Sequence, residues 1–150
     1  MIWLLRHAEA ADGSPDAERP LTERGEGQAR TVGGALAALG VEIDACLTSP
    51  MLRAEHTARL VCEALGVGVT VESALQGGPF DPDELAAGLG EEVLMVGHDP
   101  DFSMAVHRLT GAQVRMKKGG IAVVHKGELK LLLRPQELAL IARAARRTPA

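Results

Sequence analysis

Arg6 and His7 stand side by side directly after a short apolar run at residues 2–5. A guanidinium group binds two phosphate oxygens at once, and an imidazole is largely unprotonated near neutral pH because its ordinary pKa is about 6.5. An unprotonated imidazole next to a guanidinium therefore suits phosphoryl transfer. Taken alone, the pair is also compatible with the solvated end of a strand.

Two further segments repeat this arrangement of polar residues after an apolar run. Ser49-Pro50 and Arg53 follow the predicted strand 45–48, which is apolar up to Thr48, and Gly97-His98 follow residues 93–96. The parallel strands of an open α/β sheet end at one edge, where ligands bind. Three loops are therefore expected to gather two imidazoles and two guanidiniums. Adjacent guanidiniums repel each other unless an anion lies between them, so the expected ligand is a phosphate.

The residue types divide the expected reaction between the two histidines. His7, placed firmly after a strand, is expected to be the nucleophile, and a protonated His98 would stabilise charge on the transferring oxygens. Gly97 has no side chain and lets the substrate approach closely. No metal is expected, because the guanidiniums would repel a cation and no carboxylate or thiol completes a ligand set. The predicted phosphate-binding residues are Arg6, Arg53, His98, Ser49 and Gly97.

Strands and helices alternate along the chain and define the elements that must position these residues. We expect one domain over residues 1–150, an α/β three-layer sandwich with a mostly parallel central sheet and helices on both faces. Thr22 is the expected N-cap of the first helix, Gly40 its stop, and Lys126-Gly127 the turn of a hairpin. The expected strands are residues 2–5, 45–48, 69–71, 93–96, 121–125 and 129–133. The expected helices are residues 22–40, 49–65, 83–88, 101–109 and one that begins near 135.

Composition excludes several classes of partner. The net charge of −4 and the aromatic content of 2% argue against binding to nucleic acid or to an anionic membrane surface. The apolar runs are too short to span a bilayer, and the first six residues do not have the pattern of a signal peptide. Cys46 and Cys62 are too few for a disulfide framework and suit buried thiols in a reducing compartment. We therefore expect a cytoplasmic protein with no membrane partner.

The blocks that carry this chemistry resemble a known family. The run Arg6-His7-Ala8 is similar to the Arg-His-Gly/Ala signature of the histidine phosphatase superfamily, and within it the chain most resembles the short SixA-type phosphohistidine phosphatases. The resemblance implies a phosphoglycerate-mutase-like fold, a covalent phosphohistidine on His7, phosphate binding by Arg6, Arg53 and His98, and no cofactor. The similar blocks are residues 5–10, 19–25, 28–29, 49–54, 57–58, 96–100 and 118–120.

The leaving group sets the expected substrate. Larger members of the superfamily carry a carboxylate that protonates the leaving oxygen, and here only Asp81 and Asp83 are candidates, in a loop where carboxylates more often form turns. A departing imidazole needs this acid far less than an alkoxide does. We therefore expect a phosphohistidine phosphatase acting on a phosphorylated protein, such as a phosphotransfer domain. The alternatives are a phosphomonoesterase of small metabolites and a non-catalytic module that binds phosphorylated proteins.

Overall fold

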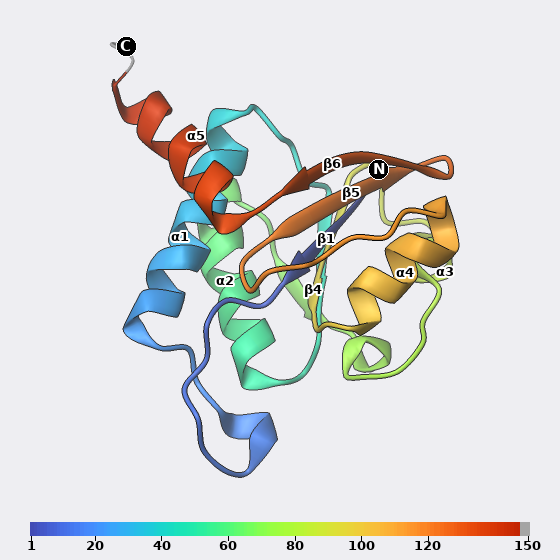
Figure 1. Ribbon diagram of the computed structural model, residues 1–150, viewed down its shortest axis with the longest axis horizontal. Coiled ribbons are helices and arrows are strands. Elements are labelled where there is room, and N and C mark those ends of the chain that lie inside the picture. Colours follow the sequence, from blue (N-terminus) through green and yellow to red (C-terminus); the bar gives the residue numbers. More distant parts are fainter. Residues whose placement is uncertain (148–150) are drawn as a thin grey trace.

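A six-stranded sheet with strand order β3-β2-β4-β1-β5-β6 forms the centre of the molecule (Figure 1). The computed structural model describes residues 1–147. The first four strands in this order are mutually parallel, and β5 and β6 are antiparallel additions at one side. The mostly parallel α/β sheet expected from the sequence is therefore confirmed. The strands are β1 (Ile2–Arg6), β2 (Ala45–Thr48), β3 (Val69–Val71), β4 (Val93–Gly97), β5 (Ile121–His125) and β6 (Glu128–Leu133).

Helices cover both faces of the sheet. In Figure 1, α1, α2 and α5 lie on one side of the strands, and α3 and α4 lie on the other. None of the helices within residues 1–147 is long and apolar enough to cross a membrane. The helices are α1 (Glu23–Ala38), α2 (Leu52–Leu65), α3 (Pro82–Ala86), α4 (Asp101–Thr110) and α5 (Pro135–Arg147), with short 3₁₀ helices η1 (Asp16–Glu18) and η2 (Ser73–Leu75).

Strand β1 is apolar throughout because it is buried from both sides. Trp3 and Leu5 belong to the core beneath α1, α2 and α5, whereas Ile2 and Leu4 belong to the core beneath α4, which contains Phe102. Successive side chains of a strand point to opposite faces, so a strand with helices above and below it has no polar alternation. This explains why the first strand ends at its first charged residue, where the sheet meets solvent.

The capping and turn residues at the ends of helices and strands mostly have the roles that the sequence predicts. The Thr22 hydroxyl accepts a hydrogen bond from Gly25 N–H (3.0 Å) and caps α1. Lys126 and Gly127 turn the β5–β6 hairpin with φ angles of 48° and 76°, as a tight two-residue turn requires. Helix α3 begins at Pro82 rather than at the expected residue 83, because Asp81 is its N-cap, and it ends at Ala86, before the expected residue 88.

Gly25 allows α1 to pack directly on the segment that follows the first strand. A Cβ at this position would lie 1.9 Å from the Glu9 carbonyl oxygen. We predict that Gly25→Ala lowers the free energy of unfolding by about 1–3 kcal/mol through overpacking. The control is Gly34→Ala in the same helix, where a Cβ meets nothing within 4 Å, and stability should rise by up to about 1 kcal/mol. Urea denaturation measures both, and equal effects at the two positions would contradict this account.

Candidate active site

The pairing of three parallel strands brings the predicted residues to one edge of the sheet. Arg6 lies opposite Gly97 in the β1–β4 ladder, and His7 N–H continues it by donating to the Gly97 carbonyl (2.9 Å). On the other side of β4, Ser49 N–H donates to the Val96 carbonyl (2.9 Å). The imidazole rings of His7 and His98 are consequently 5.3 Å apart between centroids.

His7 is fixed in one orientation and is neutral. Its side chain is buried, and Nδ1 lies 2.7 Å from the Ala8 carbonyl oxygen. A carbonyl oxygen only accepts, so Nδ1 carries the proton and Nε2 keeps its lone pair. Burial lowers the pKa of His7 from 6.5 to about 4, against the opposing effect of the Ala8 hydrogen bond and with help from the nearby charges of Arg53 and Arg6. The ring therefore presents an unprotonated nitrogen at neutral pH.

His98 is held by Ser49. The His98 Nε2 and Ser49 Oγ atoms share a hydrogen bond of 2.7 Å, and Ser49 Oγ also accepts one from Met51 N–H (3.1 Å). Burial, followed by the charge of Arg53, lowers the pKa of His98 to about 4. The sequence argument expects a protonated His98, but in the free protein burial and the adjacent guanidinium oppose that charge. A bound phosphate dianion would favour it.

One nitrogen of the Arg6 guanidinium forms a hydrogen bond, and another is buried without one. Its Nη1 donates to the Met116 carbonyl (2.7 Å), while Nε is buried with no hydrogen-bond acceptor among the described residues. Buried donors normally have partners, so an unpaired Nε indicates a place for an anionic oxygen. Gly119 N–H donates to the carbonyls of Arg6 and His7 (3.0 and 3.1 Å), so this glycine braces the chain at the site.

Arg53 projects from the first turn of α2 and meets an acidic loop. Its side chain is only 11% exposed, and it donates from Nη1 to the Asp16 carbonyl (3.0 Å) and from Nη2 to Asp16 Oδ2 (3.3 Å). Hydrogen bonding from Arg19 and the charge of Arg53 lower the pKa of Asp16. Asp16 is thus an ionised carboxylate beside the site. No sequence pattern marks it, because it lies in a polar loop among other acidic residues.

Thr57 is a second residue that sequence reasoning did not assign. Its hydroxyl donates to the Arg53 carbonyl (2.7 Å) and accepts from Ala8 N–H (3.1 Å). The hydroxyl therefore connects the turn after His7 to the helix that carries Arg53. A threonine one helical turn after a candidate phosphate ligand is the signal that could have found it.

The two candidate acids lie at the start of α3. Asp81 Oδ1 accepts hydrogen bonds from Asp83 N–H (3.0 Å) and Glu84 N–H (3.4 Å) at the start of α3. Asp81 and Asp83 line a separate pocket with Phe80 and Arg108. The described residues contain no group of three or more His, Cys, Asp or Glu side chains placed to hold a metal ion.

Similar proteins place the chain in a family. Residues 2–81 match the model of the histidine phosphatase superfamily (branch 1). An uncharacterised protein of Picosynechococcus is 30% identical over 144 residues, which cover 87% of each chain. The phosphohistidine phosphatase SixA of Escherichia coli is 38% identical over 72 residues, 47% of this chain and 45% of that protein.

Solved structures agree over a longer stretch. The structure of the protein histidine phosphatase SixA complexed with tungstate superimposes with a TM-score of 0.79 and 28% identity, and the match covers 91% of this chain and 98% of that one. A putative SixA from Agrobacterium tumefaciens shares the fold, with a TM-score of 0.76 and 24% identity over 89% of this chain and 97% of that one. The chain is thus a member of the histidine phosphatase superfamily, with a SixA-type fold.

Proposed function

We propose that this chain is a phosphohistidine phosphatase that transfers the phosphoryl group to His7 and then to water. One observation carries the proposal: the hydrogen bond from His7 Nδ1 to the Ala8 carbonyl (2.7 Å) leaves Nε2 of this buried ring unprotonated, near the positive charges of Arg53 and Arg6. A neutral, oriented imidazole beside fixed cations is the arrangement that nucleophilic phosphoryl transfer requires.

The proposed first step exchanges one phosphorus–nitrogen bond for another. Nε2 of His7 attacks phosphorus, the bond from phosphorus to the substrate imidazole breaks, and the departing nitrogen keeps the electron pair. Arg6, Arg53 and His98 hold the phosphoryl oxygens, for which the unpaired Nε of Arg6 offers a donor. Ser49 holds His98 in place. Gly97 was expected to make room for substrate, but its missing side chain makes room for the ring of Phe102 in the core, since a Cβ there would lie 2.7 Å from that ring. Water then attacks the phosphohistidine, releases phosphate and restores His7.

The charges around the site favour a nitrogen leaving group. Asp16 is the carboxylate that contacts the site, through Arg53, and its pKa is lowered, so it stays ionised and is a poor proton donor. Asp81 is occupied as the cap of α3. An alkoxide needs a proton as it leaves, whereas an imidazole is a much weaker base. The arrangement therefore supports a phosphoramidate substrate over a sugar phosphate.

Relatives support a phosphorylated protein as substrate, and one of them suggests the main alternative for the phosphate linkage. The structural neighbour that binds tungstate holds a tetrahedral oxyanion with the shape of phosphate, and the Escherichia coli relative is a phosphohistidine phosphatase. The serine/threonine-protein phosphatase PGAM5 of Mus musculus is 36% identical over 85 residues, 55% of this chain but 30% of that protein. A phosphorylated protein is the substrate common to these activities, and the linkage through nitrogen or oxygen separates them.

We predict that the purified protein hydrolyses a phosphohistidine protein with a kcat/KM at least about a hundredfold higher than for phosphoserine peptides, sugar phosphates or nucleotides, because Asp16 stays ionised and Asp81 caps α3, so neither protonates an oxygen leaving group. His7→Ala should lower turnover by roughly a thousandfold or more. Release of inorganic phosphate measures both. His107→Ala, which removes an exposed histidine of α4, is the matched control and should retain full activity.

Asp81→Asn separates the competing activities. This variant keeps the oxygen that caps α3, so the fold is preserved, and under the proposal it leaves every rate unchanged. If the parent protein instead turned over phosphate monoesters faster than phosphohistidine, and Asp81→Asn slowed the monoesters only, the chain would be a phosphomonoesterase with Asp81 as its acid. Tight binding of phosphoprotein without any turnover would identify a binding module.

The two neutral histidines predict how stability depends on pH. Their pKa is about 4 in the folded protein against 6.5 ordinarily, so between these values the unfolded chain binds more protons than the native one. The free energy of unfolding should therefore fall as pH is lowered from about 6.5 to about 4. Urea denaturation at pH 7 and pH 4.5 measures this slope. The double variant His7→Asn/His98→Asn should have a clearly shallower slope, and an identical slope would refute neutral histidines.

A further inference from the structure

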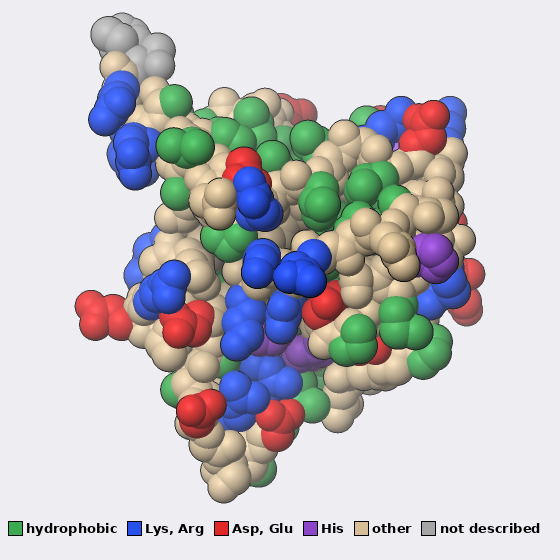
Figure 2. Space-filling model, viewed as in Figure 1, with side chains coloured by type: hydrophobic (Ala, Val, Ile, Leu, Met, Phe, Trp, Pro, Cys, Tyr) green, Lys and Arg blue, Asp and Glu red, His purple; other side chains and the backbone are tan. Residues whose placement is uncertain are grey.

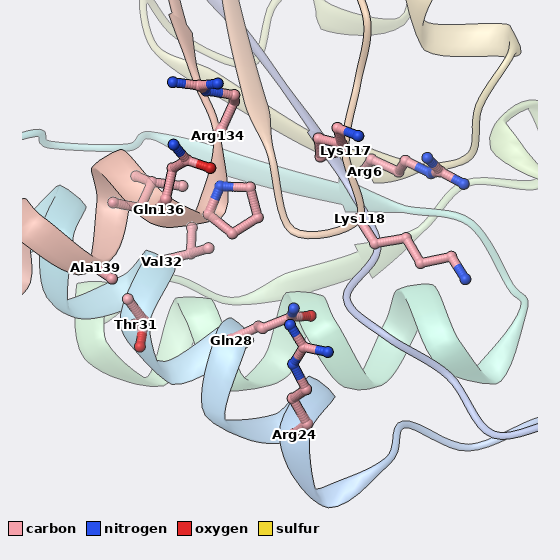
Figure 3. Close-up of a pocket in the computed structure, with 12 residues that line it drawn as sticks. Arg6, Arg24, Gln28, Thr31, Val32, Lys117, Lys118, Arg134, Gln136 and Ala139 are labelled. Atoms are coloured by element: carbon pink, nitrogen blue, oxygen red, sulfur yellow. The ribbon is translucent and has the colours of Figure 1, made fainter.

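A groove with a basic rim runs from Arg6 along the surface between α1 and α5 (Figure 3). Its volume is about 660 Å³, which falls in the range of roughly 300–1,000 Å³ that accommodates a whole ligand and greatly exceeds what one phosphate needs. Because Arg6 lines it, the groove begins next to the proposed phosphate site. The basic lining residues are Arg6, Arg24, Lys117, Lys118 and Arg134.

The cations of the groove are only partly neutralised. Lys117 and Lys118 form no ion pair with any described carboxylate, while Arg24 lies 3.8 Å from Glu9, and Arg134 is paired with Glu137. No acidic residue is among those that line the groove. The chain as a whole carries a net charge of −4, yet Figure 2 shows Lys and Arg side chains gathered at the middle of this face beside histidine. The local field therefore favours a ligand of opposite charge.

The floor of the groove is aliphatic. Pro135 and Ala139, both partly exposed, supply its accessible apolar surface, and Val32 of α1 and Leu138 of α5 lie almost fully buried beneath them. None of the lining residues is aromatic. Nucleotides and other bases bind through stacking on aromatic rings, which this floor does not offer. A polyanion without apolar groups would leave the floor uncovered. Acidic side chains for the rim and an aliphatic side chain for the floor occur together in a polypeptide.

We propose that this groove binds an acidic, leucine-containing segment of the phosphoprotein substrate, next to the histidine whose phosphoryl group enters the site. The proposal rests on the proposed function, because the segment belongs to the same substrate. Arg24 of α1 and Lys118 of the segment before β5 both line the groove (Figure 3). They are the cations placed to contact carboxylates on an incoming chain.

Two peptides of equal length test this preference without any catalysis. One carries glutamates and a leucine beside an unphosphorylated histidine, and the other has glutamine in place of each glutamate. Fluorescence anisotropy should show the acidic peptide binding roughly tenfold more tightly at low salt, with the difference shrinking as salt screens exposed charges. The phosphorylated forms of both peptides should show the same ratio in kcat/KM.

Charge reversal locates the contact. Arg24→Glu/Lys118→Glu should abolish the preference for the acidic peptide, and thermal unfolding checks that this variant is folded. Glutamate suits the first turn of α1, where Arg24 stands. The control is Lys126→Glu at the β5–β6 turn, in a pocket with Met1 and Val93 at the opposite end of the strands, which should retain both the preference and full activity.

Each outcome has one meaning. Equal binding of the two peptides, or a preference that survives Arg24→Glu/Lys118→Glu, overturns the groove proposal. In a third outcome, neither peptide displaces the other, and tripolyphosphate binds tightly to the parent protein but not to Arg24→Glu/Lys118→Glu. This outcome identifies a small-anion site and also overturns the groove proposal. Preferential binding of the acidic peptide without hydrolysis of its phosphohistidine form supports the groove and overturns the phosphatase assignment instead.

Discussion

The parallel pairing of β1 with β4 is the constraint on which the site depends. Because Arg6 lies opposite Gly97, the next residue of each strand is a histidine, and the two rings meet. A slip of one residue would send the side chains of β1 to the opposite faces. Both faces of β1 are apolar, so the core alone discriminates weakly against such a slip. The hydrogen bond from His7 N–H to the Gly97 carbonyl continues this register past the strand end, and those that join Gly119 and Gly120 to Arg6 and His7 hold β1 from its other side.

That register concentrates positive charge in a small buried volume, and the site limits the cost by keeping both imidazoles neutral. Burial and the guanidiniums of Arg53 and Arg6 oppose protonation of either ring, while Asp16 supplies one compensating charge to Arg53. A phosphate would supply the rest and would make protonation of His98 favourable at the moment when it is useful. The groove that leaves Arg6 continues the same positive field outward toward Lys118 and Arg24, so substrate attraction and phosphoryl chemistry share one electrostatic origin.

Much of the fold was predictable from sequence, because buried parallel strands appear as continuous apolar runs and end at polar residues. Sheet topology then explains why Arg6, His7, Arg53 and His98 meet, since all follow strands that end at one edge. The partners that orient them were not predictable. Arg6 reaches the carbonyl of Met116, 110 residues away, and Arg53 reaches Asp16, 37 residues away. Such contacts depend on loop paths that no local pattern specifies, as does the groove, which exists only because α1 packs against α5.

The identity of the nucleophile is the central claim, and rapid-quench trapping tests it most directly. Mixing the protein with radiolabelled phosphohistidine substrate, quenching in alkali within milliseconds and sequencing the labelled peptide should locate acid-labile phosphate on His7. In a His98→Asn variant the label should still appear on His7, formed more slowly. Label on His98 in the parent protein, or turnover without any labelled histidine, would contradict the account.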